Sequence, residues 1–247
     1  MLVLALDTTT RQGSVALARD GGVLAAGAGD AGVAHGARLP GDLMRLLDAH
    51  HLRVADVDLF AVAAGPGSFT GLRIGIATMQ GLALAHGKPL AGISALDAIH
   101  DSLHSLSLQP SALSPRDAVA AWMDAGRGQV FSAVYTNGGI YEAALVDKPA
   151  EILARWHRQR MQPTVFAGDG ALAYRDLIRA AASGAHIVDP VPPLAPSVAR
   201  LAEAQVARHG ASSPDAIAPI YIRRSDVELA RDRSATAPAV LRRDGRP

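Results

Sequence analysis

The N-terminal part of the chain alternates between short apolar runs and polar turns. Residues 2–6 form an uninterrupted apolar run, which is typical of a strand buried on both faces, and the run ends at Asp7. Residues 14–17 and 23–26 repeat the apolar pattern, and Asp20-Gly21-Gly22 between them is a hairpin turn signal. The pattern predicts a meander of three strands, with Asp7 where the first strand ends.

A helix and then a strand, loop and helix follow the meander. The stretch 37–50 predicts an amphipathic helix, because its leucines recur at helical spacing: Leu39, Leu43, Leu46 and Leu47. Residues 57–64 form another buried apolar run, which leads into the glycine-rich loop 65–71 and a helix over 72–86. A further short strand is predicted over 90–94.

The second half of the chain repeats the order of the first. Residues 118–123 form a short apolar run that ends at Asp124, as the first strand ends at Asp7. Residues 129–135 alternate like a returning hairpin strand, and Asn137-Gly138-Gly139 is the next turn signal. We interpret the two halves as an internal duplication; chance agreement between common hairpin signals is the alternative.

A turn-rich stretch, residues 105–117, marks the predicted boundary between two lobes. We divide the chain into an N-terminal lobe, residues 1–104, a C-terminal lobe, residues 105–222, and a tail, residues 223–247. The tail holds seven arginines against four acidic residues, so we expect it to be basic and disordered. The C-terminal lobe is predicted to hold a strand over 164–167 and helices over 149–159, 172–183 and 197–208.

Composition excludes several classes of protein. The 247 residues are 49% hydrophobic and 19% charged, without an apolar run long enough to span a membrane, so a membrane protein is not expected. The absence of cysteine excludes disulfide scaffolds, zinc ribbons, iron–sulfur clusters and a thiol nucleophile. With a net charge of only +1, the chain as a whole has no strong positive electrostatic potential that would attract nucleic acid. The N-terminus lacks the features of a signal peptide, so we expect a cytoplasmic protein.

The glycine-rich loop is not a standard phosphate-binding motif. Its glycines, Gly65, Gly67 and Gly71, are spaced one residue too far apart for the dinucleotide fingerprint. A tight turn with Ser68 or Thr70 as the helix N-cap explains the loop equally simply. Small residues such as Gly71 and Gly75 also give the following helix a slim face, which predicts close approach by another helix.

Two pairs of residues are candidates for chemistry. His100 and His104 share one helical face, but two histidines do not make a metal site, and we favour a solvated helix there. Asp7 and Asp124 each follow an apolar strand, and in a two-lobed protein both could face one cleft and hold Mg²⁺ or activate water. That each aspartate merely caps its own turn is the alternative, and the residues alone leave both interpretations open.

Several motifs together resemble one known family. They are Leu4-Ala5-Leu6-Asp7-Thr8 with Ser14-Val15-Ala16-Leu17, the block Gly65-Pro66-Gly67-Ser68-Phe69-Thr70-Gly71-Leu72-Arg73, Asp124-Ala125-Gly126-Arg127, and Pro219-Ile220-Tyr221-Ile222-Arg223. The chain resembles the TsaB family, also called YeaZ, over residues 1 to about 225, and the glycine block is the most specific match. The arginine-rich tail is not covered.

The resemblance implies a fold and a function. The fold is α/β, an actin-like and Hsp70-like (ASKHA) duplication in which each lobe is a mixed sheet with flanking helices. TsaB proteins take part in forming threonylcarbamoyladenosine beside the anticodon of tRNAs, as non-catalytic partners of the catalytic paralogue TsaD, together with the ATPase TsaE. The chain is thus expected to reach tRNA through the complex.

The resemblance also assigns residues. The metal-binding histidine pair of TsaD corresponds in register to Ala95 and Ile99, so no metal is expected. The two N-terminal helices are expected to bundle with TsaD, or with a second copy of the chain as a homodimer, through Leu39, Leu43, Leu46, Leu47, Leu72, Gly75, Ile76, Met79 and Leu82. No cofactor is expected to bind tightly; ATP or ADP at the interface of the complex would lie near Asp7, Thr8, Thr9, Gly168, Asp169 and Gly170.

Two other functions remain as alternatives. An actin-like ATPase or kinase would use Asp7 and Asp124 on Mg²⁺-ATP. A metallopeptidase would need a bound metal, which the missing ligand pair argues against.

Overall fold

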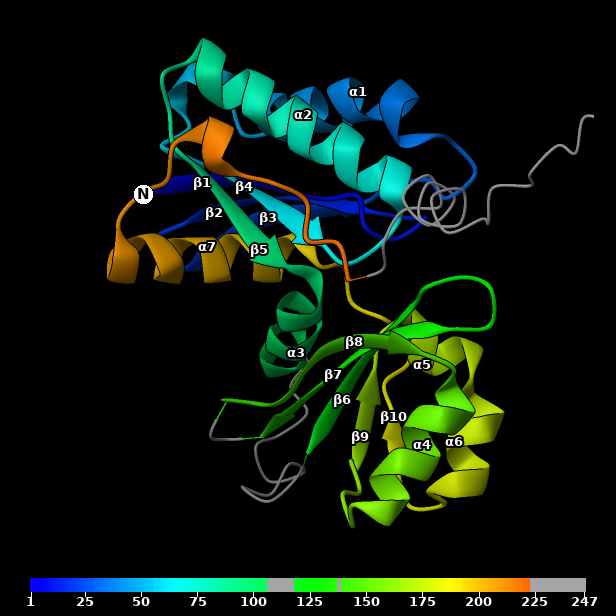
Figure 1. Cartoon of the computed structure of the whole chain (residues 1–247). Helices are drawn as coiled ribbons and strands as arrows, with labels where there is room; N and C mark the ends of the chain where they lie inside the picture. The colour runs from blue at the N-terminus through cyan, green and yellow to red at the C-terminus, as the bar shows by residue number, and fades with distance from the viewer. Residues whose placement is uncertain (106–117, 137–138, 223–247) are drawn as a thin grey trace, which may run out of the picture.

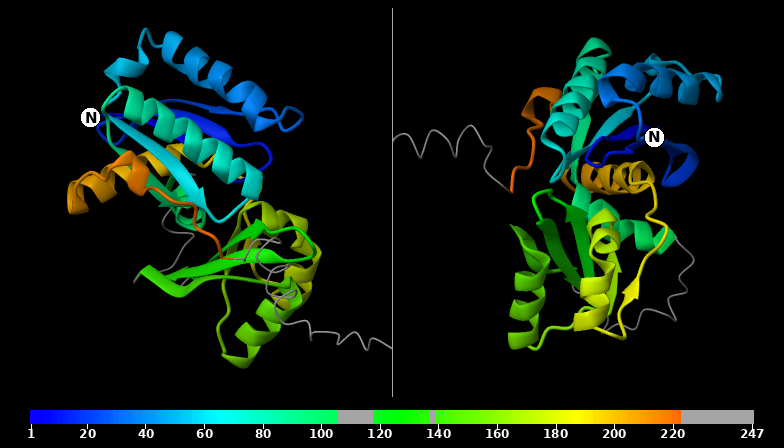
Figure 2. Two further views of the ribbon diagram at one scale, coloured as in Figure 1. Left: turned by 45° about the horizontal axis from the view of Figure 1, so that its top comes forward. Right: turned by 90° about the vertical axis from the view of Figure 1, so that its right-hand side faces the viewer.

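The computed structural model describes residues 1–105, 118–136 and 139–222, which form two lobes joined at a narrow waist (Figures 1 and 2). The predicted boundary segment, the turn at 137–138 and the predicted disorder of the tail lie outside the described residues. Within the described part, no helix combines the length and apolar character needed to cross a membrane.

The N-terminal lobe is built on a five-stranded mixed sheet with the order β3-β2-β1-β4-β5. The first three strands pair antiparallel as the predicted meander, and β4 and β5 add to β1 in parallel. The strands are β1 (Leu2–Asp7), β2 (Ser14–Arg19), β3 (Gly22–Ala28), β4 (Leu59–Gly65) and β5 (Leu90–Ser94). Every residue of β1 and β4 is buried, which explains their uninterrupted apolar runs.

The two faces of this sheet are covered by helices from different parts of the chain. Leu4, Leu6 and Phe60 point to the face covered by α1 (His35–Asp48) and α2 (Phe69–Ala85), while Val3 and Ala5 point to the opposite face. That opposite face is covered by α7 (Ala195–His209), which Figure 1 shows below the sheet. A short 3₁₀ helix, η1 (Val54–Asp56), precedes β4.

The C-terminal lobe repeats the N-terminal sheet, which supports the predicted duplication. Its strand order is β10-β9-β6-β7-β8, with β6 antiparallel to β7 and parallel to β9, as β1 is to β2 and β4. The strands are β6 (Val119–Asp124), β7 (Val130–Thr136), β8 (Gly139–Asp147), β9 (Val165–Ala167) and β10 (His186–Ile187). The outer face is covered by α4 (Pro149–Arg158), α5 (Asp169–Ala173) and α6 (Arg175–Ala181).

The structure corrects the extent, the packing or the burial of three predicted helices. The helix predicted over 172–183 is two helices, because the backbone turns at Tyr174 between α5 and α6. α7 packs on the N-terminal sheet although it lies within the predicted C-terminal lobe. The helix α3 (Ala95–Ser105) is not solvated, since Leu96, Ile99 and Leu103 are buried in the core between the lobes.

The lobes share one hydrophobic core, to which α3 and α7 contribute from between the sheets (Figure 1). His100 stacks on Tyr135 at a ring distance of 4.4 Å, and the Tyr135 hydroxyl donates a 2.6 Å hydrogen bond to Asp97. Arg200 of α7 pairs with Asp101 of α3 at 2.5 Å. His100 is thus part of the packing between the lobes, which are joined by buried apolar contacts and by partly buried polar ones.

The glycines of α2 allow close approach to the chain after β1. A Cβ atom at Gly71 would lie 2.1 Å from the carbonyl oxygen of Thr8, and one at Gly75 would lie 2.2 Å from the Thr8 hydroxyl oxygen. At Gly81, by contrast, an added Cβ meets nothing within 4 Å. The slim face of the helix at Gly71 and Gly75 therefore packs on its own lobe, and the prediction of close approach by another helix was wrong for these positions.

The two glycines Gly75 and Gly81 lie in one helix and give opposite predictions. Gly81→Ala should raise the free energy of unfolding by about 0.5 to 1 kcal/mol, because alanine favours the helix and has room. Gly75→Ala should lower it by about 1 to 3 kcal/mol, because Thr8 must move and lose its bond to Gly71. Urea unfolding gives the free energy of unfolding of both variants. Equal changes in the two variants would show that the contact between Gly75 and Thr8 is not tight.

Candidate functional site

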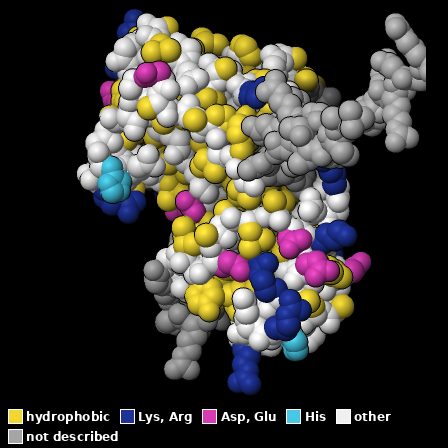
Figure 3. All heavy atoms as spheres, viewed as in Figure 1, with side chains coloured by type: hydrophobic (Ala, Val, Ile, Leu, Met, Phe, Trp, Pro, Cys, Tyr) yellow, Lys and Arg dark blue, Asp and Glu magenta, His cyan; other side chains and the backbone are white. Residues whose placement is uncertain are grey.

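A cavity of about 620 Å³ lies between the two lobes. Figure 3 shows the molecule narrowing at this level, with apolar side chains gathered at the waist. Four segments line the cavity: residues 9–11 after β1, residues 66–69 with Leu72 at the start of α2, residues 124–127 after β6, and residues 220–222; Phe131 and Asp169 complete the wall. A cavity of this size matches a small ligand or one nucleotide.

The segment after β1 is held by hydrogen bonds on both sides. The buried carboxylate of Asp7 accepts from the Thr9 amide at 2.8 Å and from the Thr9 hydroxyl at 2.5 Å. The Thr8 hydroxyl donates to the carbonyl of Gly71 at 2.8 Å, and the Ser68 amide donates to the carbonyl of Thr9 at 2.9 Å. These bonds fix the wall of the cavity within the N-terminal lobe.

Burial raises the pKa of Asp7 above its ordinary value. The two hydrogen bonds from Thr9 and the positive charge of Arg38 act in the opposite direction but do not cancel the desolvation. A buried carboxylate with a raised pKa beside a cleft is a feature of functional sites, although buried structural groups show it as well.

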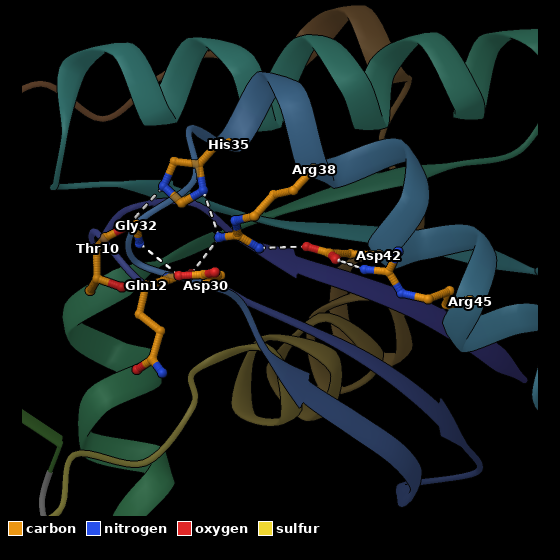
Figure 4. Close-up of polar contacts among 9 residues, drawn as sticks. Thr10, Gln12, Asp30, Gly32, His35, Arg38, Asp42 and Arg45 are labelled. Carbon is orange, nitrogen blue, oxygen red and sulfur yellow. Dashed lines mark hydrogen bonds and ion pairs between the residues drawn. The ribbon is translucent and has the colours of Figure 1, made fainter.

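A buried arginine on α1 supports the same segment (Figure 4). The Arg38 guanidinium donates to the backbone carbonyl of Gln12 and pairs with Asp42 at 2.5 Å, and its side chain is only 7% exposed. His35 contacts Arg38 at 2.8 Å and the carbonyl of Thr10 at 3.0 Å. Burial lowers the pKa of His35, and the charge of Arg38 adds to that effect, so a neutral imidazole is favoured beside the arginine.

The sequence interpretation missed this cluster. The spacing of Arg38 and Asp42, four residues apart in a predicted helix, is the signal that could have indicated a pair. A Cβ at Gly29 would overlap the Arg38 guanidinium, so the turn before α1 closes over the side chain. Arg38 is therefore a positioning residue for the cleft segment.

The glycine-rich loop serves as a turn and a cap, as the simpler interpretation predicted. Ser68 is the N-cap of α2, and its hydroxyl accepts from the Gly71 amide at 3.2 Å. Gly65 has a φ of +123°, a value that favours glycine, and an added Cβ would lie 2.6 Å from the carbonyl oxygen of Ile220. The loop thus makes room for a segment far away in the sequence.

That distant segment, residues 210–222, runs from the end of α7 along β5 and α2 (Figure 2), and its last three residues line the cavity. The amide nitrogen of the Gln80 side chain donates to the carbonyls of Pro214 and Ile217 at 2.9 and 3.0 Å, and the Ile220 amide donates to Ala64 at 2.7 Å. We call this segment the C-terminal strap. It brings Tyr221 against Phe69 at the rim of the cavity, with ring centroids 5.4 Å apart.

The C-terminal lobe places two carboxylates at the cavity. Asp169 accepts from the Asp124 amide at 3.1 Å, and Asp124 itself accepts from the Gly126 amide at 2.9 Å. Burial raises the pKa of Asp169, and the negative charges of Asp124 and Asp7 raise it further. Gly168 and Gly170 touch the backbone of β6 so closely that neither has room for a Cβ.

Each aspartate accepts a hydrogen bond within its own turn, as one interpretation predicted, whereas only Asp124 also lines the cavity, as the other predicted for both. The charge of Asp7 reaches Asp169 on the facing wall. Thr9 lines the cavity, whereas Asp7 and Thr8 do not. Within the described ranges, no group of three or more histidine, aspartate or glutamate side chains is arranged to hold a metal ion.

The residues predicted to contact a partner lie mostly in the core of the N-terminal lobe. Seven have little or no exposure, namely Leu39, Leu43, Leu47, Leu72, Gly75, Ile76 and Met79, while Leu46 and Leu82 are partly exposed. The sequence pattern shows which face of a helix is apolar, and here that face covers the lobe's own sheet. The outer surface of α1 and α2 presents Met44 and Leu84 instead, at 45% and 60% exposure.

Comparison of the sequence with known proteins identifies relatives. The family model described as TsaD, tRNA N6-adenosine threonylcarbamoyltransferase, matches residues 8–231. The tRNA threonylcarbamoyladenosine biosynthesis protein TsaB of Escherichia coli is 35% identical over 184 residues, 72% of this chain and 75% of that protein. TsaB of Bacillus subtilis is 27% identical over 182 residues, with the same shares covered.

Comparison of the structure gives the same result. YeaZ from Pseudomonas aeruginosa superposes with a TM-score of 0.67 at 26% identity, over 89% of this chain and 99% of that chain. Component A of (R)-2-hydroxyglutaryl-CoA dehydratase from Acidaminococcus fermentans has a TM-score of 0.50 at 12% identity, over 84% of this chain and 99% of that chain, and shares the fold alone. The two duplicated mixed sheets with flanking helices are the actin-like (ASKHA) fold.

The raised pKa of Asp7 predicts how stability depends on pH. A carboxyl whose pKa is raised by folding stabilises the protein below its ordinary pKa of 3.8 and loses that contribution as pH rises through the raised value. Asp7→Asn keeps the oxygen that accepts both Thr9 bonds and removes the buried charge. The variant should therefore melt at a higher temperature than wild type near pH 7, and the difference should shrink towards pH 4.

Asp56→Asn is the control with the opposite sign, because the bond from Arg53 lowers the pKa of Asp56. That variant should melt below wild type at neutral pH, and its deficit should disappear as pH falls. Melting curves by circular dichroism at several pH values give both trends. A lower melting temperature for Asp7→Asn at neutral pH would mean that the buried charge stabilises the fold through Arg38.

Proposed function

The chain belongs to the TsaB (YeaZ) family, and from that membership we propose that it is the non-catalytic partner subunit of a complex that forms N6-threonylcarbamoyladenosine beside the anticodon of tRNAs. A role in tRNA threonylcarbamoyladenosine biosynthesis follows from the relatives themselves. The catalytic subunit of the proposal is a TsaD-like paralogue, and a TsaE-like ATPase is the third component. The proposal places the protein in the cytoplasm with its tRNA.

One observation carries the non-catalytic role. The positions that correspond to the metal-binding histidines of TsaD are Ala95 and Ile99, and both side chains are buried in the core between the lobes, at 0% and 2% exposure. A methyl group and a butyl group offer no nitrogen or oxygen to a metal. Histidine at either position would put a polar ring into packed apolar surroundings. In this chain, Ala95 and Ile99 instead contribute to the core that joins the two lobes.

The partner surface of the proposal is the outer face of α1 and α2. Met44 of α1 and Leu84 of α2 are exposed, and Leu46 and Leu82, which pack against the lobe's core, are partly exposed. Exposed apolar side chains grouped on one face are typical of protein interfaces. This face would bind the TsaD-like subunit, and a second copy of the chain when that subunit is absent.

We propose that ATP or ADP binds at the interface of the complex and not tightly to this chain alone. The amide and hydroxyl of Thr9 already bond to Asp7, and the glycines at 168 and 170 are pressed against β6. The walls of the cavity carry two carboxylates, Asp124 and Asp169, against two arginines, Arg11 and Arg127, so they offer phosphate groups no net positive charge. These features support a site that needs a partner's groups before it holds nucleotide.

An ATPase or kinase that uses Asp7 and Asp124 is the second candidate. The observation that favours it is that Asp124 and Asp169 line one cavity and that burial raises the pKa of Asp169, because perturbed carboxyls are frequent at catalytic sites. Burial also raises the pKa of Asp7, two residues before the lining residue Thr9. The two candidates differ in whether this chain has an activity of its own.

Reconstitution tests the first candidate. Purified alone, the chain should form no threonylcarbamoyladenosine on tRNA, and it should restore formation when mixed with the TsaD-like and TsaE-like proteins and threonylcarbamoyl-adenylate. Leu84→Glu should weaken restoration, because it puts a charge on the outer face of α2. Ile140→Glu, at an equally exposed position of β8, is the matched control and should restore fully. Turnover by the chain alone would disprove the non-catalytic role.

Substitution of the aspartates separates the two candidates. As a partner subunit, Asp7→Asn and Asp124→Asn should each bind the TsaD-like protein and support most of the modification rate, because asparagine keeps the turn hydrogen bonds. If the two carboxylates positioned Mg²⁺-ATP, each change should lower the rate on the order of a hundredfold or more. A variant with normal partner binding and almost no activity would favour the ATPase or kinase.

A further inference from the structure

Two of the motifs that resemble the TsaB family meet at the rim of the cavity. Phe69 and Arg73 come from the glycine block, and Tyr221 comes from the C-terminal strap. The rings of Phe69 and Tyr221 stack with an interplanar angle of 27°, and the Arg73 guanidinium lies 4.0 Å from the centroid of Phe69. The Arg73 Nε also donates to the Tyr221 hydroxyl at 3.2 Å. We call these three residues the aromatic rim.

The rings of this cluster keep a substantial part of their surface in contact with water. The chain has ten Phe, Tyr and Trp residues, and three of them count as exposed in the part of the chain that the structure describes. Two of the three are Phe69, at 41%, and Tyr221, at 46%; the third, Tyr141, lies on β8. Exposed aromatic rings that are already aligned and supported by a cation are typical of a surface that stacks on another flat group.

The strap fixes the place of Tyr221 in the fold. Backbone and side-chain bonds from Ala64 and Gln80 fix residues 214–220, and Gly65 leaves space for the carbonyl of Ile220. Tyr221 and Phe69 both line the cavity of about 620 Å³, so a flat group stacked on the rim would also enter it. A ring held in this way loses little conformational entropy when it binds.

We propose that the aromatic rim stacks an unpaired base of the tRNA anticodon loop. Proteins recognise single-stranded RNA by stacking its bases on aromatic side chains and arginine, and this is the chemistry that Phe69, Tyr221 and Arg73 present. The proposal rests on the proposed function, since it takes the tRNA as the substrate of the complex. It adds a direct contact between this chain and the RNA.

The charges favour RNA over a free nucleotide. A nucleoside triphosphate would bring its phosphates into a cavity whose lining has two carboxylates and two arginines and therefore no net positive charge, whereas an RNA can insert one base and keep its phosphates outside. Arg11 and Arg127 line the same cavity. The described chain ends at Ile222 on the cavity wall, and the 25 residues that follow contain seven arginines and four acids, a composition that suits a phosphate backbone.

The test uses the full chain and a synthetic anticodon stem-loop RNA with the fluorescent base 2-aminopurine in its loop. Fluorescence anisotropy measures affinity, and quenching of 2-aminopurine reports stacking. Wild type should bind and quench. Tyr221→Leu should weaken binding about tenfold and remove the quenching, because leucine keeps apolar bulk but offers no flat ring. Tyr221→Phe should retain most of both signals, and Tyr141→Leu, the other exposed tyrosine, should behave as wild type.

Two further measurements keep the proposal falsifiable. If Tyr221→Leu fails to fold, as judged by its melting curve, Phe69→Leu takes its place. In addition, 4-thiouridine in the RNA loop should cross-link the wild-type chain at the peptide that contains Phe69 or Tyr221, and cross-links elsewhere alone would overturn the proposal. Equal affinity and quenching for folded Tyr221→Leu and wild type would overturn it as well.

Other outcomes separate this proposal from those on which it depends. If millimolar ATP binds wild type in a Tyr221-dependent way and displaces the RNA, the rim is a nucleotide site and the RNA assignment is wrong. If the reconstituted complex modifies tRNA at the same rate and KM with Tyr221→Leu, the proposed function stands and the RNA contact fails. If reconstitution gives no product while the chain still quenches the RNA probe, the contact stands and the proposed function fails.

Discussion

The structure depends on the close approach of α2 to the chain that leaves β1. Gly71 and Gly75 have no room for a side chain because Thr8 fills the space, and the Thr8 hydroxyl bonds to the carbonyl of Gly71. The same contact places the Ser68 amide on the carbonyl of Thr9. One helix therefore fixes both segments that the N-terminal lobe gives to the cavity, while its apolar face covers the sheet beneath it.

The other parts of the cleft are arranged around this contact. Arg38 holds the segment after β1 from the far side, and the C-terminal strap crosses the glycine loop and brings Tyr221 to Phe69. The shared core with α3 sets the C-terminal lobe opposite, with Asp124 and Asp169 facing the cavity. The fold thus builds the cleft from segments of one chain.

Local patterns predicted most of the fold, and contacts between distant segments explain what they missed. The buried runs, the hairpin turns and the repeated Asp7 and Asp124 identified the strands and the duplication. The leucine stripe of α1 correctly marked an apolar face, but no pattern distinguishes a face that covers its own sheet from one that awaits a partner. Likewise, α3 was predicted to be a solvated helix. The second sheet, which helps to bury it, follows the turn-rich segment 105–117 in the sequence, and no local pattern connects the two. The stacking of Phe69 on Tyr221 spans more than half the chain and leaves no local signal.

Amide hydrogen exchange of the chain alone tests most directly whether the cleft is preformed. The Thr9 and Ser68 amides bond within the chain, to Asp7 and to Thr9 respectively, so they should exchange slowly, at rates similar to those of the β1 and β4 amides, before any partner is added. Addition of the TsaD-like subunit should change these rates little. Fast exchange of both amides in the free chain, with protection only in the complex, would contradict the account.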